Sequence, residues 1–448
     1  MAKESGSGKQ ETIVALATGA LPSGIAIVRI SGPRALDLGK TLSKVFPDHP
    51  GKLKPSEFMD PADGRVIDRG LICWFAAPKS HTGEDVCELH LHGSAAVANK
   101  ILDVLASSGA RLAEAGEFTR RAFENGKMDL TEIEGLADLL AAETEAQRRL
   151  AVRLASDEMH RKISDWREAL VRARALLEAE FDFADEDDVP DSMVLQVRKT
   201  ARELKSKVGD ALSGYHAGEI IRRGFRVALV GPPNAGKSSL LNALARRDIA
   251  IVTDVAGTTR DVLEAKVDID GLAVIVFDTA GIRESGDRVE ILGVDRARQA
   301  AKAADLVIWL SPKDAPEAPT GELGVDAVFR SKEDLPGEQV VGKREDFPIE
   351  GKVSTVNPAG LDSFIAFISR RARHATSGED ILVSRKRQKA LLEKAGKHLE
   401  RFDAMLGADR VLAAEELRLA GECFGRLTGR IDPEELLDVI FSEFCIGK

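Results

Sequence analysis

The sequence predicts a multidomain protein of mixed α/β and α class. An α/β domain with a doubly wound, mostly parallel sheet is inserted into a discontinuous helical domain. The chain has 448 residues, a length that allows about two to four domains. Apolar residues recur at helical spacing on both sides of a central stretch, and within that stretch β-like runs alternate with helical ones. A smaller α+β domain is predicted ahead of the helical residues.

The composition, with 44% hydrophobic and 30% charged residues, indicates a soluble globular protein. No segment approaches the roughly 18 consecutive apolar residues of a membrane helix, and the polar N-terminus contains no signal core, so no membrane association is expected. Four scattered cysteines are too few for a disulfide framework, which favours a reducing, cytoplasmic compartment. Because the net charge is −10, a nucleic-acid partner would have to meet local basic patches.

Residues 1–127 are predicted to form the N-terminal α+β domain. Short apolar runs mixed with glycines indicate strands, and helical spacing separates them. The expected elements are strands at Ile25–Ile30 and Leu71–Phe75 and helices at Arg34–Leu42 and Ala95–Ser107.

Residues 128–221 are predicted to form the first part of the helical domain. The segment Thr131-Glu132-Ile133-Glu134 has the capping-box pattern that begins a helix. Apolar residues then recur at three- and four-residue spacing to Phe181, which predicts one or two long helices. The acidic stretch Asp182–Asp191 contains a proline and is predicted to be a loop before a helix over Met193–Ile221.

Residues 222–375 are predicted to form the inserted domain, and residues 376–448 to complete the helical domain. Alternation of strands with helices is the pattern of a parallel sheet covered on both faces. The expected elements are strands at Phe225–Val230, Ala273–Phe277, Leu306–Leu310 and Val325–Phe329 and a helix at Leu361–Arg373. From Ser384 onward the apolar spacing is helical again.

The most informative motif is Gly231-Pro232-Pro233-Asn234-Ala235-Gly236-Lys237-Ser238, which fits the phosphate-loop spacing G-x-x-x-x-G-K-[ST]. A predicted strand leads into it and a helical pattern leaves it, as a phosphate cradle requires. Backbone N–H groups can face the anion, Lys237 can reach the outer phosphates, and Ser238 can offer its hydroxyl to Mg²⁺. A nucleoside triphosphate is therefore predicted to contact Asn234, Ala235, Gly236, Lys237, Ser238 and Ser239.

Two further segments resemble the switch motifs of translation-factor-type GTPases, which predicts a P-loop G domain. Asp278-Thr279-Ala280-Gly281 ends an apolar run; its carboxylate can hold Mg²⁺ through water and Gly281 lets a backbone N–H approach the γ-phosphate. An ordinary turn is the alternative for these four residues. Between this segment and the phosphate loop, Thr253-Asp254-Val255-Ala256-Gly257-Thr258-Thr259 can place a threonine hydroxyl on Mg²⁺ and a backbone N–H on the γ-phosphate.

The base-reading motif departs from the usual [NT]-K-x-D, because the chain carries Ser331-Lys332-Glu333-Asp334. Asp334 can accept both guanine N–H donors, and Lys332 can pack along the base. Ser331 has a shorter side chain than the usual amide, so one of the side chains that would support the loop is shortened. A polar loop without a base-reading role is the alternative. Order and spacing favour guanine, with Ser354-Thr355 in the place of the final guanine-contact loop.

A glutamine often follows Asp-x-x-Gly in GTPases and orients the attacking water. This chain has Ile282 at that position, so another group must serve. Glu290 is a candidate, although its spacing fits a solvated carboxylate at a helix start equally well.

These motifs, together with segments outside the G domain, resemble the bacterial tRNA-modification GTPases of the MnmE or TrmE family. The likeness covers nearly the full chain, and its C-terminal Cys-Ile-Gly-Lys is especially specific. The matching segments beyond the phosphate loop are Ile25–Gly32, Thr82–Leu89, Gly116–Lys127, Thr253–Asp261, Asp278–Glu284 and Phe444–Lys448.

The resemblance implies a potassium-dependent GTPase that works in the cytoplasm as a homodimer. Its N-terminal domain would bind a tetrahydrofolate derivative of 5-formyl or 5,10-methylene type and form the dimer. An MnmG-like partner carrying FAD would join it in a heterotetramer or larger complex. Together they would add an aminomethyl or carboxymethylaminomethyl group to C5 of the wobble uridine of certain tRNAs. Ser94, where the family usually has a second glycine, departs from its pattern.

The resemblance also assigns roles to residues of the G domain. It implies K⁺ ligation by Asn234, Thr253, Val255 and Thr258, and Mg²⁺ ligation by Ser238 and Thr259. The potassium ion would sit against the phosphates where other GTPases use an arginine finger. Glu290 falls at the family's catalytic glutamate, and Lys237 and Gly281 act on the phosphates with it.

The folate contacts implied by the resemblance are Arg29, Glu88, Lys127 and the terminal Lys448. Cationic side chains suit an anionic, glutamate-tailed ligand, and Glu88 can accept pterin N–H donors, although each residue by itself also fits a surface salt bridge. Cys445 is either a reactive thiol or a small apolar residue. His90 and His92 alternate on a predicted strand and are interpreted as structural.

A cluster of basic residues near the junction of the G and helical domains is a candidate tRNA contact, with a solvated helix end as the alternative. The cluster consists of Arg370, Arg371, Arg373, Arg385, Lys386, Arg387 and Lys389. A second functional hypothesis is a regulatory GTPase switch in ribosome or ribonucleoprotein assembly. The folate-type segments and the C-terminal Cys-Ile-Gly-Lys argue against that switch.

Overall fold

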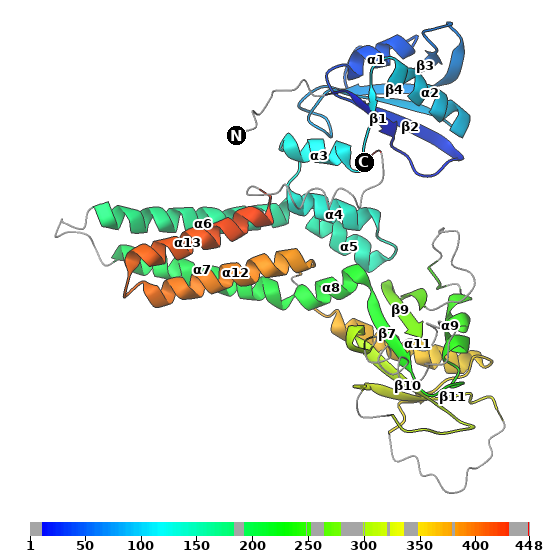
Figure 1. The fold of residues 1–448 in the computed structure, drawn as a ribbon, viewed down its shortest axis with the longest axis vertical. Coiled ribbons are helices and arrows are strands. Elements are labelled where there is room, and N and C mark those ends of the chain that lie inside the picture. The colour runs from blue at the N-terminus through cyan, green and yellow to red at the C-terminus, as the bar shows by residue number, and fades with distance from the viewer. Residues whose placement is uncertain are drawn as a thin grey trace, which may run out of the picture. The chain divides into compact units, whose positions relative to one another are not determined.

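The structure is a computed structural model that describes residues 11–182, 192–247, 249–251, 264–278, 299, 301–319, 323–335, 348–378, 381–429 and 447. The chain divides into two compact units (Figure 1). The first comprises Met1–Ala137, His160–Ile163 and Gly425–Lys448, and the second Asp138–Met159 and Ser164–Phe424. The predicted domain boundaries after residues 127, 221 and 375 stay predictions.

The first unit is built on one six-stranded sheet in the order β3-β4-β5-β2-β1-β6. Its neighbouring strands are antiparallel, except that β1 and β6 are parallel. The strands are β1 (Ile13–Leu16), β2 (Ser23–Ser31), β3 (Lys54–Met59), β4 (Val66–Phe75), β5 (Val86–Gly93) and β6 (Arg111–Leu112). Both predicted strands therefore form, as parts of β2 and β4.

Two helices cover one face of this sheet, α1 (Ala35–Leu42) and α2 (Ala95–Ser107), as the sequence predicted to within one residue. They enclose a core that includes the buried Val28 of β2 and Leu89 of β5. Since side chains alternate along a strand, their neighbours Arg29 and Glu88 lie on the opposite face, paired across the β2–β5 ladder. Helix α3 (Glu117–Glu124) contributes Phe118 to a separate small cluster with Ile13 and Ala15 of β1.

Helix α4 (Leu130–Leu140) begins one residue before Thr131, so the predicted cap at Thr131 is wrong. The carboxylate of Asp129 accepts from the backbone N–H of Thr131 and of Glu132, both at 2.8 Å. The Glu132 carboxylate accepts in return from the N–H of Asp129 at 2.7 Å. This reciprocal pair is the capping box, two residues earlier than predicted, and Thr131 with Glu134 is instead buried inside the helix.

The helical part of the second unit contains more and shorter helices than predicted. The stretch expected to form one or two helices forms three, and the helix expected over Met193–Ile221 is divided in two. The described helices are α5 (Glu145–Leu154), α6 (Asp157–Asp182), α7 (Ser192–Ser213), α8 (Tyr215–Arg223), α12 (Lys386–Met405) and α13 (Arg410–Leu427). In Figure 1, α6 runs beside α13, where the ring centres of Trp166 and Phe424 lie 5.7 Å apart, and α7 runs beside α12.

A contact between distant parts of the chain accounts for the start of a separate helix at α5. Gln147 accepts hydrogen bonds from the backbone N–H of Glu143 and Thr144, which starts the new helix. Its amide nitrogen also donates to the carbonyl of Arg222 at 3.2 Å, at the end of α8. Helix α5 is therefore fastened to a segment about seventy-five positions away, a contact that local apolar spacing does not encode.

The second sheet has the order β12-β11-β10-β7-β9-β8 and is parallel except for β8, which runs antiparallel to β9. Its strands are β7 (Phe225–Val230), β8 (Glu264–Ile269), β9 (Leu272–Asp278), β10 (Leu306–Pro312), β11 (Ala327–Ser331) and β12 (Gly351–Lys352). Helices α9 (Lys237–Ala245) and α11 (Pro358–Ala375) pack on one face, and a second apolar cluster covers the other. The doubly wound prediction is confirmed; β8 and β12 were not predicted.

Candidate functional site

The phosphate loop joins β7 to α9 in the predicted order. Gly231 has φ +145°, and a Cβ there would lie 2.5 Å from the carbonyl oxygen of Leu310 on β10. Gly236 caps α9 at φ +93°. Gly231 and Gly236 both have the positive φ that favours glycine, and a side chain at Gly231 would also clash with β10. The loop therefore lies tightly against the sheet, with the N-terminus of α9 beside it.

Lys237 is positioned inside the loop that it is expected to serve. Its ammonium donates to the carbonyls of Gly231 and Pro232, each at 2.9 Å, and the residue is buried. Burial lowers the pKa of Lys237, and the nearby carboxylate of Asp278 partly opposes that shift. Its contacts are to neutral carbonyls, so an anionic phosphate in the loop is the stronger partner for this cation.

Two predicted magnesium-site residues come together at the edge of the sheet. The Ser238 hydroxyl donates to the Asp278 carboxylate at 2.8 Å, from the first turn of α9 to the last residue of β9. Both groups present hard oxygen donors, the kind that Mg²⁺ prefers. Among the described residues no group of three or more His, Cys, Asp or Glu could hold a metal ion.

Ser331 braces the phosphate loop although it is shorter than an amide side chain. Its hydroxyl donates to the carbonyl of Ala235 at 2.6 Å, and Ser331 is 3% exposed. The two residues are 96 positions apart in the chain. The predicted base-reading segment is thus physically joined to the loop that holds the phosphates. Lys332 follows in left-handed conformation at φ +58° and pairs with Asp314 at 2.8 Å.

Ser354, in the loop predicted to make the final guanine contact, positions the carboxylate of Asp334. The Ser354 hydroxyl donates to that carboxylate at 2.6 Å. The same hydroxyl oxygen accepts from the backbone N–H of Val356 and Asn357, both at 3.1 Å. Ser354 therefore orients the carboxylate that is predicted to read guanine, and it is buried while the adjacent Thr355 is exposed.

Part of the predicted nucleotide site lies outside the described residues. The described members are Asn234, Ala235, Gly236, Lys237, Ser238, Ser239, Asp278, Ser331, Lys332, Asp334, Ser354 and Thr355. The remainder, outside them, are Thr253, Asp254, Val255, Ala256, Gly257, Thr258, Thr259, Thr279, Ala280, Gly281 and Glu290. Asn234, the predicted potassium ligand, is exposed at the loop in left-handed conformation with φ +62°.

A second cluster of predicted residues lies on the open face of the first unit's sheet. Arg29 and Glu88 form an ion pair at 2.9 Å, and the Arg29 guanidinium lies 5.7 Å from the centre of the Phe118 ring. His90 approaches the same carboxylate at 3.6 Å. Hydrogen bonding from His90, followed by the charge of Arg29, lowers the pKa of Glu88 against the opposing effect of burial.

Lys127, another predicted folate contact, lies in the described part of the same unit. The Lys127 side chain lies beside Gly83, where a Cβ would be 3.2 Å from its Cγ. Lys448 and Cys445 lie outside the described residues, but Gly447 packs so closely against Leu16 that a Cβ would lie 1.9 Å from the Leu16 carbonyl. Gly447 therefore lies at the end of β1, the strand that pairs with the one that carries Arg29.

Sequence reasoning did not mark His81 and underestimated His90. Partial desolvation of the imidazole, followed by the charge of Arg29, lowers the pKa of His81, although the residue as a whole is exposed. No periodicity or motif marked it. His90 was interpreted as structural, yet it contacts Glu88. His92 forms a hydrogen bond with Asp68 at 2.8 Å, in keeping with a structural role.

No helix in the described part of the chain is long and apolar enough to cross a membrane.

Comparison with known proteins gives matches over nearly the whole chain. A family model for the GTP-binding protein TrmE N-terminus matches residues 12–127, and one for the MnmE helical domain matches residues 130–445. A protein of Mesorhizobium japonicum named tRNA modification GTPase MnmE is 47% identical, with 98% of this chain and 99% of that protein covered. The proteins of that name from Azorhizobium caulinodans and Rhizobium johnstonii are 46% and 47% identical over the same shares. The solved G domain of the FeoB iron transporter of T. maritima aligns at 20% identity with a TM-score of 0.23, covering 34% of this chain and 99% of that one, and supports no inference.

The Ser331 brace generates a testable expectation. Ser331→Ala removes the hydrogen bond to the buried Ala235 carbonyl and should weaken GDP binding at least about fivefold, because a lost hydrogen bond costs about 1 kcal/mol. Fluorescence titration with a labelled GDP measures the affinity. Ser331→Thr keeps the hydroxyl and should bind nearly as well as wild type. Equal affinity of the alanine variant and wild type would show that the brace does not support the loop.

Proposed function

The chain belongs to the MnmE family of tRNA modification GTPases, and on that premise we propose that it hydrolyses GTP in the service of wobble-uridine modification in tRNA. The proposal of GTP hydrolysis rests mainly on the hydrogen bonds that join the nucleotide-binding motifs. Ser238 pairs with Asp278 at 2.8 Å, and Ser331 pairs with Ala235 at 2.6 Å. These contacts support a proposed triphosphate site and a proposed base site that adjoin at one edge of the sheet.

Guanine is the base whose hydrogen-bond donors best match the groups at this edge of the sheet. Its N1–H and exocyclic N2–H₂ are adjacent donors that a carboxylate can accept together. Asp334 supplies the carboxylate, and its hydrogen bond from Ser354 restricts its orientation. Adenine presents an acceptor at N1, so the same carboxylate disfavours ATP.

The residues of the phosphate loop would stabilise the charge that develops during phosphoryl transfer. Lys237 would move from its carbonyl partners to the β- and γ-phosphates, and the N–H groups at the start of α9 would contact the β-phosphate. Ser238 would hold Mg²⁺, with Thr259 as the second protein ligand and Asp278 acting through water. Bound Mg²⁺ would neutralise phosphate charge. We propose that Glu290 orients the attacking water, because Ile282 cannot.

The exposed Asn234 is proposed to ligate K⁺, with Thr253, Val255 and Thr258 as the remaining ligands. An amide oxygen at the rim of the phosphate loop is a suitable donor for such a cation, and its exposure leaves it accessible. Bound K⁺ would supply the fixed positive charge that an arginine finger supplies elsewhere. Dimerisation of two G domains would complete the site.

For the first unit we propose a folate site at Arg29, Glu88, Lys127 and Lys448, taking a 5-formyl- or 5,10-methylene-type tetrahydrofolate. The Arg29–Glu88 pair at 2.9 Å offers both a cation for a glutamate tail and an acceptor for pterin N–H groups. The protein would act as a cytoplasmic homodimer whose N-terminal domain, residues 1–127, forms the constitutive interface. An FAD-containing MnmG-like partner would complete a heterotetramer or larger complex on tRNA.

Potassium dependence is tested by phosphate-release kinetics. We expect GTP hydrolysis at least about tenfold faster in KCl than in NaCl at equal ionic strength, because the cation replaces a group worth about 10³-fold or more. Asn234→Ala should lose this preference. Asn242→Ala, on the exposed side of α9, is the matched control and should keep it. Equal wild-type rates in the two salts would contradict the potassium role.

Guanine selectivity is tested at Asp334. Asp334→Asn cannot accept both guanine donors, and two hydrogen bonds to a charged group are worth about 3 kcal/mol or more, so GTP affinity should fall about 100-fold. XTP, which carries an acceptor at C2, should bind the variant better than GTP does. Glu333→Gln, one residue away, should leave the preference for GTP unchanged. Similar affinities of wild type for GTP and ATP would overturn the assignment of guanine.

The cellular role is tested by mass spectrometry of wobble nucleosides in tRNA from a strain that lacks this protein. The aminomethyl-type modification at C5 should be absent, and a plasmid copy should restore it while a copy with Glu88→Ala should not. Titration of the purified protein with 5-formyltetrahydrofolate should show saturable binding. Unchanged wobble nucleosides together with no folate binding would instead favour a regulatory GTPase switch.

A further inference from the structure

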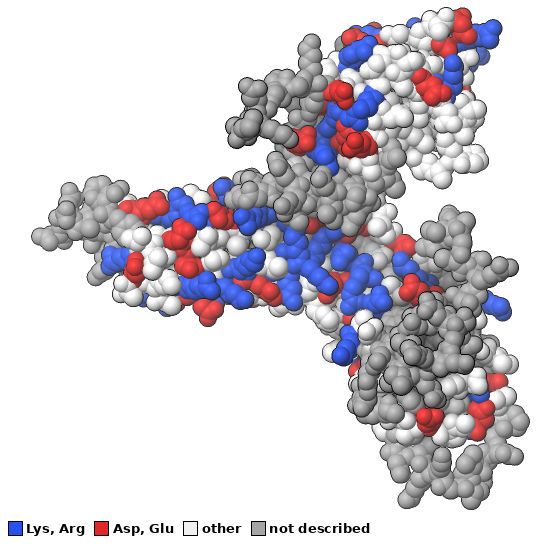
Figure 2. Space-filling view, in the orientation of Figure 1, with Lys and Arg blue, Asp and Glu red and all other residues white. Residues whose placement is uncertain are grey.

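The second unit carries a concentration of basic side chains where three helices meet. The residues that define this basic surface are Arg222 of α8, Arg370 and Arg371 of α11, and Lys386, Arg387 and Lys389 of α12. Figure 2 shows lysine and arginine side chains gathered over the stretch where α8 and the start of α12 lie in Figure 1. The chain as a whole has a net charge of −10, so this concentration departs from the average surface.

Contacts between the three helices make the basic surface continuous. Arg222 donates to the carbonyl of Ser384, just before α12, at 3.3 Å. The Lys389 ammonium lies 4.8 Å from the centre of the Tyr215 ring at the start of α8. The other end of α8 reaches α11, because Arg223 pairs with Asp305 at 2.6 Å and Asp305 borders the pocket that Arg370 and Arg371 line.

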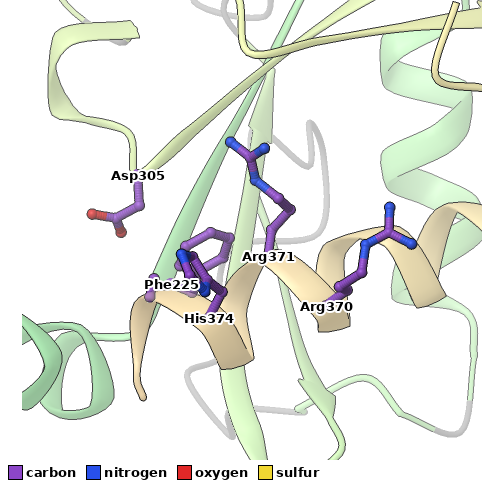
Figure 3. A pocket seen from close by; sticks show the side chains of 6 residues that line it. Phe225, Asp305, Arg370, Arg371 and His374 are labelled. Carbon is purple, nitrogen blue, oxygen red and sulfur yellow. The ribbon is translucent and has the colours of Figure 1, made fainter. Parts of the chain in front are cut away.

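That pocket makes part of the basic surface concave. It has a volume of about 530 Å³ and is bordered by Phe225 and His374 as well as by the two arginines. Figure 3 shows that Arg370, Arg371 and His374 extend from the same helix, with His374 beside Phe225. Asp305 is the one carboxylate among the lining residues. It is 7% exposed and is already engaged by the Arg223 guanidinium and the backbone N–H of Arg226.

The carboxylates that face Arg370, Arg371 and Lys389 neutralise these cations only weakly. Arg370 lies 3.5 Å from Glu350 and Arg371 3.7 Å from Asp326, and all four side chains are more than a third exposed. Exposed pairs of this kind contribute about 0–1 kcal/mol, so a phosphate can replace the carboxylate at little cost. Lys389 faces Glu393 at 3.7 Å, and no carboxylate in the described part of the chain pairs with Lys386.

The start of α12 adds an electrostatic argument. Its first turn contains no acidic residue, while Lys386, Arg387 and Lys389 place positive charge at the positive end of the helix dipole. Such an arrangement lowers helix stability in the free protein, and a bound polyanion would reverse the effect. Arg385, which is not part of the basic surface, has a structural role. It pairs with Asp138 at 2.7 Å, and both side chains are mostly buried.

We propose that the basic surface binds the phosphate backbone of tRNA, an inference that rests on the proposed function. Cations on three helices suit an extended polyanion better than a single phosphate group. The acidic remainder of the protein repels RNA, so electrostatic attraction is concentrated at this surface. Its arginines and lysines contact phosphates without reading bases, which positions the tRNA and leaves recognition of the wobble base to other groups.

The test measures binding of total tRNA to the full-length protein by filter retention at several KCl concentrations. The variant Lys386→Gln/Lys389→Gln removes two proposed phosphate contacts. It should bind several-fold more weakly near 150 mM salt, and the slope of log Kd against log[KCl] should fall by between 1 and 2, since each phosphate contact contributes about 0.7–0.9. Arg370→Gln, at the rim of the pocket, should lower the slope by a smaller amount in the same direction.

The matched control is Lys199→Gln/Lys207→Gln, which removes the same charge from exposed positions of α7 in the same unit. It should retain wild-type affinity and slope, and all variants should retain wild-type GTP hydrolysis without tRNA and the wild-type melting temperature. Equal binding by the two double variants would overturn the basic surface as the tRNA site. Loss of binding to vesicles containing phosphatidylserine, with tRNA binding unchanged, would assign the surface to membranes and likewise overturn the proposal. Absence of tRNA binding by wild type would instead refute the tRNA part of the proposed function.

Discussion

The parallel order of four strands is the constraint on which the nucleotide site depends. Strands β9, β7, β10 and β11 are neighbours and run in the same direction, so their carboxyl ends lie at one edge of the sheet. Asp278 ends β9, Ser331 ends β11, and the phosphate loop follows β7. Each group is brought to that edge by strand pairing, and the crevice outside the carboxyl ends is where such sheets bind ligands. Hydrogen bonds then connect the loops into one site.

The first unit brings its candidate residues together by a different route. Its β2–β5 pair is antiparallel, and the register sets Arg29 directly across from Glu88. A shift of one residue would move both side chains into the apolar core beneath α1 and α2. Burial of Val28, Ile30 and Leu89 therefore enforces the position of the ion pair, and the charged face is left beside Phe118 and the C-terminal Gly447.

Cationic side chains serve two separate purposes in the second unit. Arg223 and Arg385 are committed to carboxylates that are largely buried, Asp305 and Asp138, and they hold helices to the sheet and to one another. Removing either partner of such a pair leaves an uncompensated buried charge. Arg370 and Arg371 of the basic surface pair only with exposed carboxylates, Glu350 and Asp326. Their charge can therefore be offered to an outside polyanion at little cost.

The sequence by itself determined the motifs, the order of the elements and most strand positions, since these depend on residue type and local spacing. The run Phe225–Val230, for example, was predicted to the residue, because a strand buried on both faces needs an almost continuous apolar run. Tertiary contacts decided what local patterns left ambiguous. Asp129 and Thr131 both begin capping-box patterns, and only burial of Thr131 and Glu134 selects Asp129. The role of Ser331 as a brace likewise required the fold, because its partner Ala235 is brought within 2.6 Å by strand pairing and not by sequence proximity.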